Sequence, residues 1–275
     1  MTKGDTICPV TAEFWARKPL IGMVHLGALP GSPRDSGNFE SVLALATKDA
    51  QALAEGGADA IMVENFFDAP FEKGRVPAHT VAALTRAALE IRAVAPNTPL
   101  GINCLRNDAL SALAIAHIVG AQFVRVNVWV GAAVTDQGII EGAAREAILY
   151  RKFLGAENIR IFADVFVKHA AQLGDGSMTL TDAAKDAVLR GLADALIVSG
   201  TATGASTSEE TVCEAAKAVP GTPVLVGSGF SEATAAGLLA AGAAGAIVGT
   251  SLKESNSVAS PVAAAKVRAL RAAMN

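Results

Sequence analysis

Polar residues that can carry out acid–base chemistry or bind an anion follow eight aliphatic runs along the chain. The residues that end these runs are His25, Glu64 with Asn65, Asn103, Asn127, Asp164, Ser199, Ser228 and Thr250. A histidine beside carboxylates can divide the roles of general acid and general base when burial separates their pKa values. Asp164, Glu64 and His25 are therefore predicted to transfer protons on a bound substrate, if the fold brings them together.

Further charged side chains stand close to the fourth and fifth of these ends. Arg125 precedes Asn127 by two residues, so both side chains should point to the same side of one strand. Lys168 and His169 follow Asp164 by about one turn. A desolvated Lys168 could form a Schiff base, but we favour the interpretation that it is the salt-bridge partner of Asp164.

A divalent metal is an alternative use of the same residues. Glu64, Asp164 and a histidine offer the oxygen and nitrogen ligands that such ions take in proteins. The spacing along the chain does not decide between acid–base and metal-assisted chemistry, so the cofactor stays open at this stage.

The last three runs end in turns of glycine, serine and threonine that are typical of an anion site. The residues of these turns are Ser199, Gly200, Gly227, Ser228, Gly229, Gly249, Thr250 and Ser251. Glycine lets the backbone approach a ligand closely, and amide and hydroxyl groups donate to phosphate oxygens. Lys253 would add a positive charge. The pattern predicts that the phosphate of a ligand is bound here.

These residues can share one site only if the runs are strands of a single parallel sheet. The runs are Leu20–Leu26, Asp59–Glu64, Leu100–Cys104, Phe123–Val128, Ile159–Val165, Ala195–Ser199, Val224–Gly227 and Ala246–Gly249. Segments rich in alanine and leucine separate them, among them Glu40–Glu55, Val81–Val94, Leu110–Val119 and Thr181–Leu192. Strand–helix alternation over a whole chain indicates a parallel sheet, and eight units allow it to close.

A single (β/α)8 barrel, which needs roughly 250 residues, is therefore the predicted α/β fold. The competing open, doubly wound sheet favours a GxGxxG turn after its first strand, and Gly27-Ala28-Leu29-Pro30-Gly31 does not match it. We expect residues 1–18 to be an N-terminal extension and residues 19–275 to form the barrel. Two long segments, Trp129–Ile140 and Lys168–Thr181, are expected to act as lids or to contribute to an interface.

Composition narrows the classes of partner. The net charge of −3 predicts no nucleic-acid partner. The three cysteines, Cys8, Cys104 and Cys213, show neither CxxC spacing nor a disulfide framework, which favours a reducing, cytoplasmic compartment. The most apolar stretch, Leu110 to Val124, is too short and too polar to span a bilayer. We therefore expect a soluble protein without an integral membrane segment, and a homo-oligomer remains possible.

Several motifs resemble those of the BtpA/SgcQ family. They are Gly22-Met23-Val24-His25-Leu26, Val63-Glu64-Asn65, Leu105-Arg106-Asn107-Asp108, Thr135-Asp136-Gln137-Gly138, Lys168-His169, Gly227-Ser228-Gly229 and Val248-Gly249-Thr250-Ser251. The resemblance covers about residues 20–253. It implies a barrel of the ribulose-phosphate-binding type, and the family takes its name from a factor needed for photosystem I biogenesis. It implies no particular reaction. Cys104 departs from the family pattern, in which an aliphatic residue is usual.

Three functions are compatible with these patterns. The first is an enzyme, an isomerase, epimerase or lyase, that acts on a small phosphorylated metabolite such as a sugar or nucleoside phosphate. The second is a non-catalytic biogenesis factor for photosystem or membrane proteins, which would use the outer surface of the barrel. The third is a sensor that binds a phosphorylated compound without turning it over. We favour the enzyme, although its reaction class rests on analogy at the level of the fold.

Overall fold

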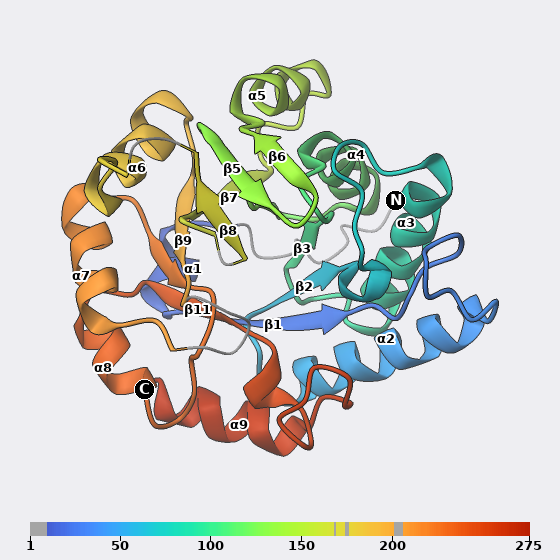
Figure 1. Ribbon diagram of the computed structural model, residues 1–275. Coiled ribbons are helices and arrows are strands. Elements are labelled where there is room, and N and C mark those ends of the chain that lie inside the picture. The colour runs from blue at the N-terminus through green and yellow to red at the C-terminus, as the bar shows by residue number, and fades with distance from the viewer. Residues whose placement is uncertain (1–9, 168, 174–175, 201–205) are drawn as a thin grey trace.

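Eight parallel strands close into a barrel in the part of the chain that the computed structural model describes, residues 10–167, 169–173, 176–200 and 206–275 (Figure 1). They are β1 (Leu20–His25), β2 (Ala60–Glu64), β3 (Leu100–Asn103), β4 (Phe123–Val126), β7 (Arg160–Val165), β9 (Ala195–Val198), β10 (Val224–Val226) and β11 (Gly245–Val248). Their order around the barrel is β1-β11-β10-β9-β7-β4-β3-β2. The predicted (β/α)8 barrel is confirmed, with every strand within two residues of its predicted bounds.

Helices surround the barrel on the outside (Figure 1). They are α2 (Phe39–Glu55), α3 (Ala78–Val94), α4 (Ala109–Val119), α5 (Ala144–Phe153), α6 (Leu180–Lys185), α7 (Glu209–Ala218), α8 (Ala235–Ala240) and α9 (Ala264–Ala273). A π-helical turn, η2 (Asp186–Arg190), continues α6, and short 3₁₀ helices, η1 (Phe66–Asp68) and η3 (Thr250–Leu252), follow β2 and β11. Side-chain caps start several helices; for example, the Asp108 carboxylate accepts a hydrogen bond from the amide of Ser111.

The interior of the barrel is filled by side chains from all parts of the sheet. Phe123 of β4 and Phe162 of β7 stack with their ring centroids 4.6 Å apart. Gly101 of β3 makes room for them, because a Cβ at this position would overlap the Phe123 ring. The packed interior forces the ligand site to the rim, as in other barrels of this type.

A short helix that precedes the first strand packs against the same interior core. In α1 (Ala12–Ala16), Phe14 is buried in this core, and the Trp15 ring centroid lies 5.5 Å from that of Phe162. Residues 12–16 belong to the predicted N-terminal extension. They therefore contribute to the packing at the base of the barrel, opposite the strand ends that carry the polar residues.

The two long segments after β4 and β7 pair with each other. β5 (Ala132–Thr135), β6 (Gly138–Glu141) and β8 (Ala170–Gln172) form an antiparallel sheet in the order β6-β5-β8. Ala133 and Ile140 are buried against Val128 and Val167 on the inner side of this sheet. These three strands thus form a small antiparallel sheet that packs on residues just beyond the ends of β4 and β7.

None of the helices in the described residues combines the length and the hydropathy that a bilayer crossing requires.

Candidate functional site at the carboxyl ends of the strands

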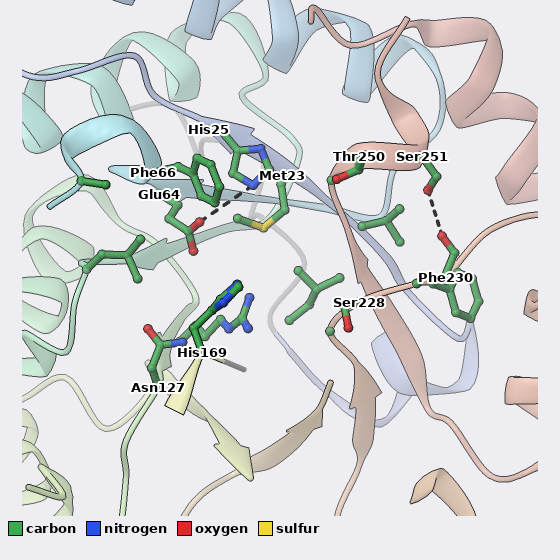
Figure 2. Close-up of a pocket in the computed structure, with 18 of the residues that line it drawn as sticks. Met23, His25, Glu64, Phe66, Asn127, His169, Ser228, Phe230, Thr250 and Ser251 are labelled. Carbon is green, nitrogen blue, oxygen red and sulfur yellow. Dashed lines mark hydrogen bonds and ion pairs between the residues drawn. The ribbon is translucent and has the colours of Figure 1, made fainter. Parts of the chain in front are cut away.

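One large cavity lies at the rim, and it unites both groups of residues that the sequence singled out. Its volume is about 790 Å³. His25 and Glu64 line it on one side, and Ser228, Thr250 and Ser251 on the other (Figure 2). The closed barrel explains this meeting, because the carboxyl ends of all eight strands converge on one small area.

Glu64 and His25 form the acid–base part of the site. Each side chain is 7% exposed, and His25 Nε2 lies 3.8 Å from Glu64 Oε1. The strands β1 and β2 pair in register at these two residues, so neighbouring strand ends bring them together. Asn103, at the paired position of β3, donates from Nδ2 to Glu64 Oε2. Asn103 does not line the cavity, so it orients Glu64 from behind.

Asp164 lies beneath the floor of the cavity and does not line it. Arg125 donates from Nε and Nη2 to the two carboxylate oxygens, each over 2.9 Å, and Asn127 Nδ2 donates to Oδ2 over 2.7 Å. The Asp164 side chain is fully buried. Burial lowers the pKa of the Arg125 guanidinium, but the charge and hydrogen bonding of Asp164, together with the charge of Glu64, outweigh it and raise that pKa above its ordinary value.

The geometry favours a different role for Asp164 from the one the sequence suggested. With three hydrogen bonds on its oxygens it is poorly placed to exchange a proton with a substrate. It holds Arg125 and Asn127, both of which line the cavity. The two-residue spacing correctly placed these two side chains on one side of β4. Lys168, the expected salt-bridge partner, lies outside the described residues, and His169 lines the cavity as an exposed residue.

We also considered whether the site could bind a divalent metal. In the described part of the chain, no three His, Cys, Asp or Glu side chains are grouped so that they could hold an ion. The oxygens of Asp164 are occupied by Arg125 and Asn127, and Glu64 accepts from Asn103. The described residues therefore give no support to a divalent metal held by Glu64, Asp164 and a histidine.

The predicted phosphate turns surround the opposite side of the cavity. Its lining includes Gly227, Ser228, Gly229, Gly249, Thr250 and Ser251. Gly229 and Thr250 both line the cavity, at turns where backbone amides can donate to a bound anion. Gly249 is needed for space: a Cβ there would lie 2.6 Å from Cε1 of His25.

Ser199 and Gly200, the other two residues assigned to the anion site, do not line the cavity. The Gly200 amide donates to Ser228 Oγ over 2.7 Å, so the turn after β9 supports the turn after β10. Residues 201–205 lie outside the described part of the chain. Gly200 thus acts on the site through Ser228.

Lys253 does not belong to the anion site, which corrects the expectation from the sequence. Its side chain is 2% exposed and pairs with Asp49 of α2. Asp49 also accepts from the amide of Val262 over 2.7 Å. Asp49 thereby fastens the segment after β11 to α2 on the outside of the barrel.

Sequence reasoning missed two features of the cavity. Arg106, in the loop after β3, lines it and is 6% exposed; burial lowers the pKa of its guanidinium, against the attraction of nearby carboxylates. Phe66, Phe67 and Phe71, in the loop after β2, also line it. The sequence did contain signals for both. Arg106 stands in Leu105-Arg106-Asn107-Asp108, just after the end of a buried strand, and Phe66 and Phe67 are adjacent just after another.

Comparison with known proteins identifies the family of the chain. Residues 16–275 match the BtpA family. The chain belongs to the BtpA family. It is 47% identical to the photosystem I biogenesis protein BtpA of Synechocystis over 95% of this chain and 89% of that one. It is 46% identical to an uncharacterized protein of Pyrococcus furiosus over 93% of this chain and 94% of that one.

Solved structures support the fold. The thiamine phosphate pyrophosphorylase of Pyrococcus furiosus superposes with a TM-score of 0.57 at 15% identity, covering 94% of this chain and 96% of that one. The fold of this BtpA-family member is a TIM barrel with enzymes of the ribulose-phosphate-binding type among its structural neighbours. At this identity the likeness concerns the fold alone.

Proposed function

We propose that this BtpA-family chain is a cytoplasmic enzyme that binds a small phosphorylated metabolite, a sugar or nucleoside phosphate, and moves a proton on it. One observation carries the proposal: a single cavity of about 790 Å³ joins glycine-rich turns on one side to a buried carboxylate–histidine pair on the other. Such a combination of convergent polar groups in a large pocket is the usual form of an active site.

The phosphate is assigned to the turns after β10 and β11. The amides of Gly229 and Thr250 and the hydroxyl of Thr250 can donate to its oxygens. This side of the rim, after the last two strands, is where barrels of this type frequently hold phosphate. Thr250→Val removes one hydroxyl donor at nearly constant volume.

Proton transfer is assigned to Glu64 and His25. His25 adjoins the turn after β11, where a Cβ on Gly249 would lie 2.6 Å from its Cε1, so a phosphate anchored at the turns would hold the rest of the ligand beside the pair. Arg106 and Arg125 offer positive charge to an oxygen that becomes negative as a proton leaves a neighbouring carbon. This arrangement suits an isomerase, an epimerase or a lyase.

The proposal is tested in two steps. Binding of ribose 5-phosphate is measured by calorimetry for the wild type and for Thr250→Val, which should weaken it about tenfold or more, since hydrogen bonds to charged groups contribute about 1.5–3 kcal/mol. Turnover is then screened on a panel of sugar and nucleoside phosphates. Glu64→Gln should reduce the rate about 100-fold or more, and the matched control Glu254→Gln, an exposed carboxylate, should not.

If compounds of the panel bind but none is turned over, the protein is not an enzyme for them, and the sensor that binds a phosphorylated compound is the remaining function. Unchanged turnover in Glu64→Gln would remove Glu64 as the catalytic group. Failure of all phosphorylated compounds to bind would overturn the proposal as a whole.

A biogenesis factor is the second candidate, because the Synechocystis relative is named for that role. The outer face of the β6-β5-β8 sheet carries the exposed side chains Val134 and Ile139, and Leu173 is exposed just beyond β8, which would suit a protein partner or a second copy of the chain. Expression of wild type and Glu64→Gln in a Synechocystis strain that lacks BtpA separates the candidates. Equal restoration of photosystem I by both would favour the non-catalytic role.

A further inference from the structure

Three phenylalanines form one side of the cavity. Phe66, Phe67 and Phe71 all line it, and each is only half-buried. The chain has 10 phenylalanines in all, so their presence within one short loop is a concentration of aromatic surface at the site. The rings of Phe66 and Phe67 meet edge to face with centroids 5.2 Å apart. We call these three residues the aromatic wall.

Buried polar groups hold the loop of the wall in place. Asn65 Oδ1 accepts from the amide of Leu105 over 2.7 Å, and its Nδ2 donates to Asp68 Oδ2 over 2.9 Å. The other oxygen of Asp68 accepts from the amide of Leu29. Burial raises the pKa of Asp68, against these hydrogen bonds. The loops after β1, β2 and β3 are thereby joined, so the wall is preorganised before any ligand arrives.

The wall and the phosphate turns stand on either side of His25. β1 lies between β2 and β11 in the barrel, and the Phe66 ring centroid is 4.7 Å from that of His25. Figure 2 shows Phe66, His25 and Glu64 on one side and Ser228, Thr250 and Ser251 on the other. A ligand that reaches from the turns to the wall therefore passes the acid–base pair at its middle.

The size of the cavity allows such a ligand. Its volume of about 790 Å³ lies in the upper part of the roughly 300–1,000 Å³ range of sites for drug-sized ligands. A sugar phosphate bound at the turns would leave the half-exposed rings of the wall in water. Aromatic faces pack well against planar rings of many kinds, which is how proteins bind bases without selecting their identity.

We propose that the ligand of this site is a phosphorylated sugar that carries a planar heteroaromatic ring, with the ring against Phe66 and the phosphate at Gly229 and Thr250. The inference rests on the proposed function and narrows its substrate class to nucleotide-like compounds. It also places the sugar beside Glu64 and His25, so the proton is moved on the sugar and not on the ring.

The test compares ligands that differ only in the ring. Dissociation constants are measured by calorimetry for ribose 5-phosphate and for the 5′-monophosphates of adenosine, uridine and nicotinamide riboside. At least one mononucleotide should bind about tenfold or more tightly than ribose 5-phosphate, in line with the contribution of one stacked base. Phe66→Leu keeps apolar volume but removes the aromatic face, so it should abolish most of this advantage and leave ribose 5-phosphate binding unchanged.

Phe153→Leu is the matched control, because Phe153 on α5 is 82% exposed and does not line the cavity. It should alter no dissociation constant. If ribose 5-phosphate binds in a manner sensitive to Thr250→Val and no mononucleotide binds more tightly, the ring assignment is overturned and the phosphate assignment stands. If none of the four compounds binds, both fail. An advantage that survives in Phe66→Leu would also overturn the assignment of the ring to the wall.

Discussion

The two sides of the rim are built in different ways. On the side of β1 to β4 and β7, charged and amide side chains line the cavity, and buried partners hold several of them, as Asn103 holds Glu64 and Asp164 holds Arg125. On the side of β10 and β11, glycine turns bring the backbone itself to the cavity. Side chains need partners to fix their charge and direction, whereas backbone amides need only space. The first side is therefore sensitive to loss of a partner and the second to gain of an atom.

We call the side of β1 to β4 and β7 the side-chain half and the side of β10 and β11 the backbone half. Removal of a buried partner on the side-chain half should lower the stability of the protein most. Arg125→Met leaves the buried Asp164 carboxylate without its cation, so the free energy of unfolding should fall by about 3–5 kcal/mol. Urea denaturation at neutral pH measures it. The double variant Arg125→Met/Asp164→Leu removes both charges and should recover most of the loss. A single variant as stable as the wild type would contradict the role given to this pair.

Addition of one carbon atom on the backbone half should have the second largest effect on stability. Gly249→Ala places a Cβ against His25, so it should lower the free energy of unfolding by about 1–3 kcal/mol and displace the imidazole. Gly74→Ala is the control, because a Cβ there meets no atom within 4 Å. Thermal unfolding of both variants provides the comparison, and equal melting temperatures would refute the crowding at Gly249.

Loss of a single hydroxyl on the backbone half should have a smaller effect. Ser251 Oγ donates to the carbonyl of Phe230 over 2.8 Å and so joins the turns after β10 and β11. Ser251→Ala should lower the free energy of unfolding by about 0.5–1.5 kcal/mol. The exposed Ser36→Ala provides the reference in urea denaturation. Equal midpoints for the two variants would show that the turns do not depend on this bond.

The smallest effect concerns a thiol on the side-chain half. Burial raises the pKa of Cys104, just after β3, well above its ordinary value, so the thiol stays protonated. In a Cys8→Ser/Cys213→Ser background, iodoacetamide at pH 8 should leave the native protein unlabelled and label it after denaturation, as mass spectrometry would detect. Rapid labelling of the native protein would mean that this half opens more readily than its packing indicates.

The sequence predicted the barrel because its signal is local. Each buried strand is an aliphatic run, and each is followed by a polar residue where the chain leaves the core. The Gly-Ser-Gly and Gly-Thr-Ser turns were likewise recognisable, since backbone binding depends on residues adjacent in the chain. Six of the eight residues assigned to the anion site line the cavity for this reason.

Pairings between distant residues could not be read in the same way. Lys253 meets Asp49 across 204 positions, and nothing near Lys253 distinguishes a buried ion pair from a phosphate contact. The β5–β8 pairing joins residues 35 to 39 positions apart, such as Thr135 with Ala170 and Ala133 with Gln172, through strands too short to show clear alternation. Asp164 was correctly placed at a strand end, but its hydrogen bonds to Arg125 and Asn127 depend on the register of β4 and β7.

The helix at the base of the barrel has a consequence for folding experiments. Trp15 reaches Phe162 only when β7 is in place, and the ring of strands is complete only when β11 joins β1. In the variant Trp129→Phe, Trp15 is the single tryptophan of the chain, and its intrinsic fluorescence would therefore report when α1 packs against the base of the barrel. It offers an optical signal for closure that is independent of any ligand at the opposite end.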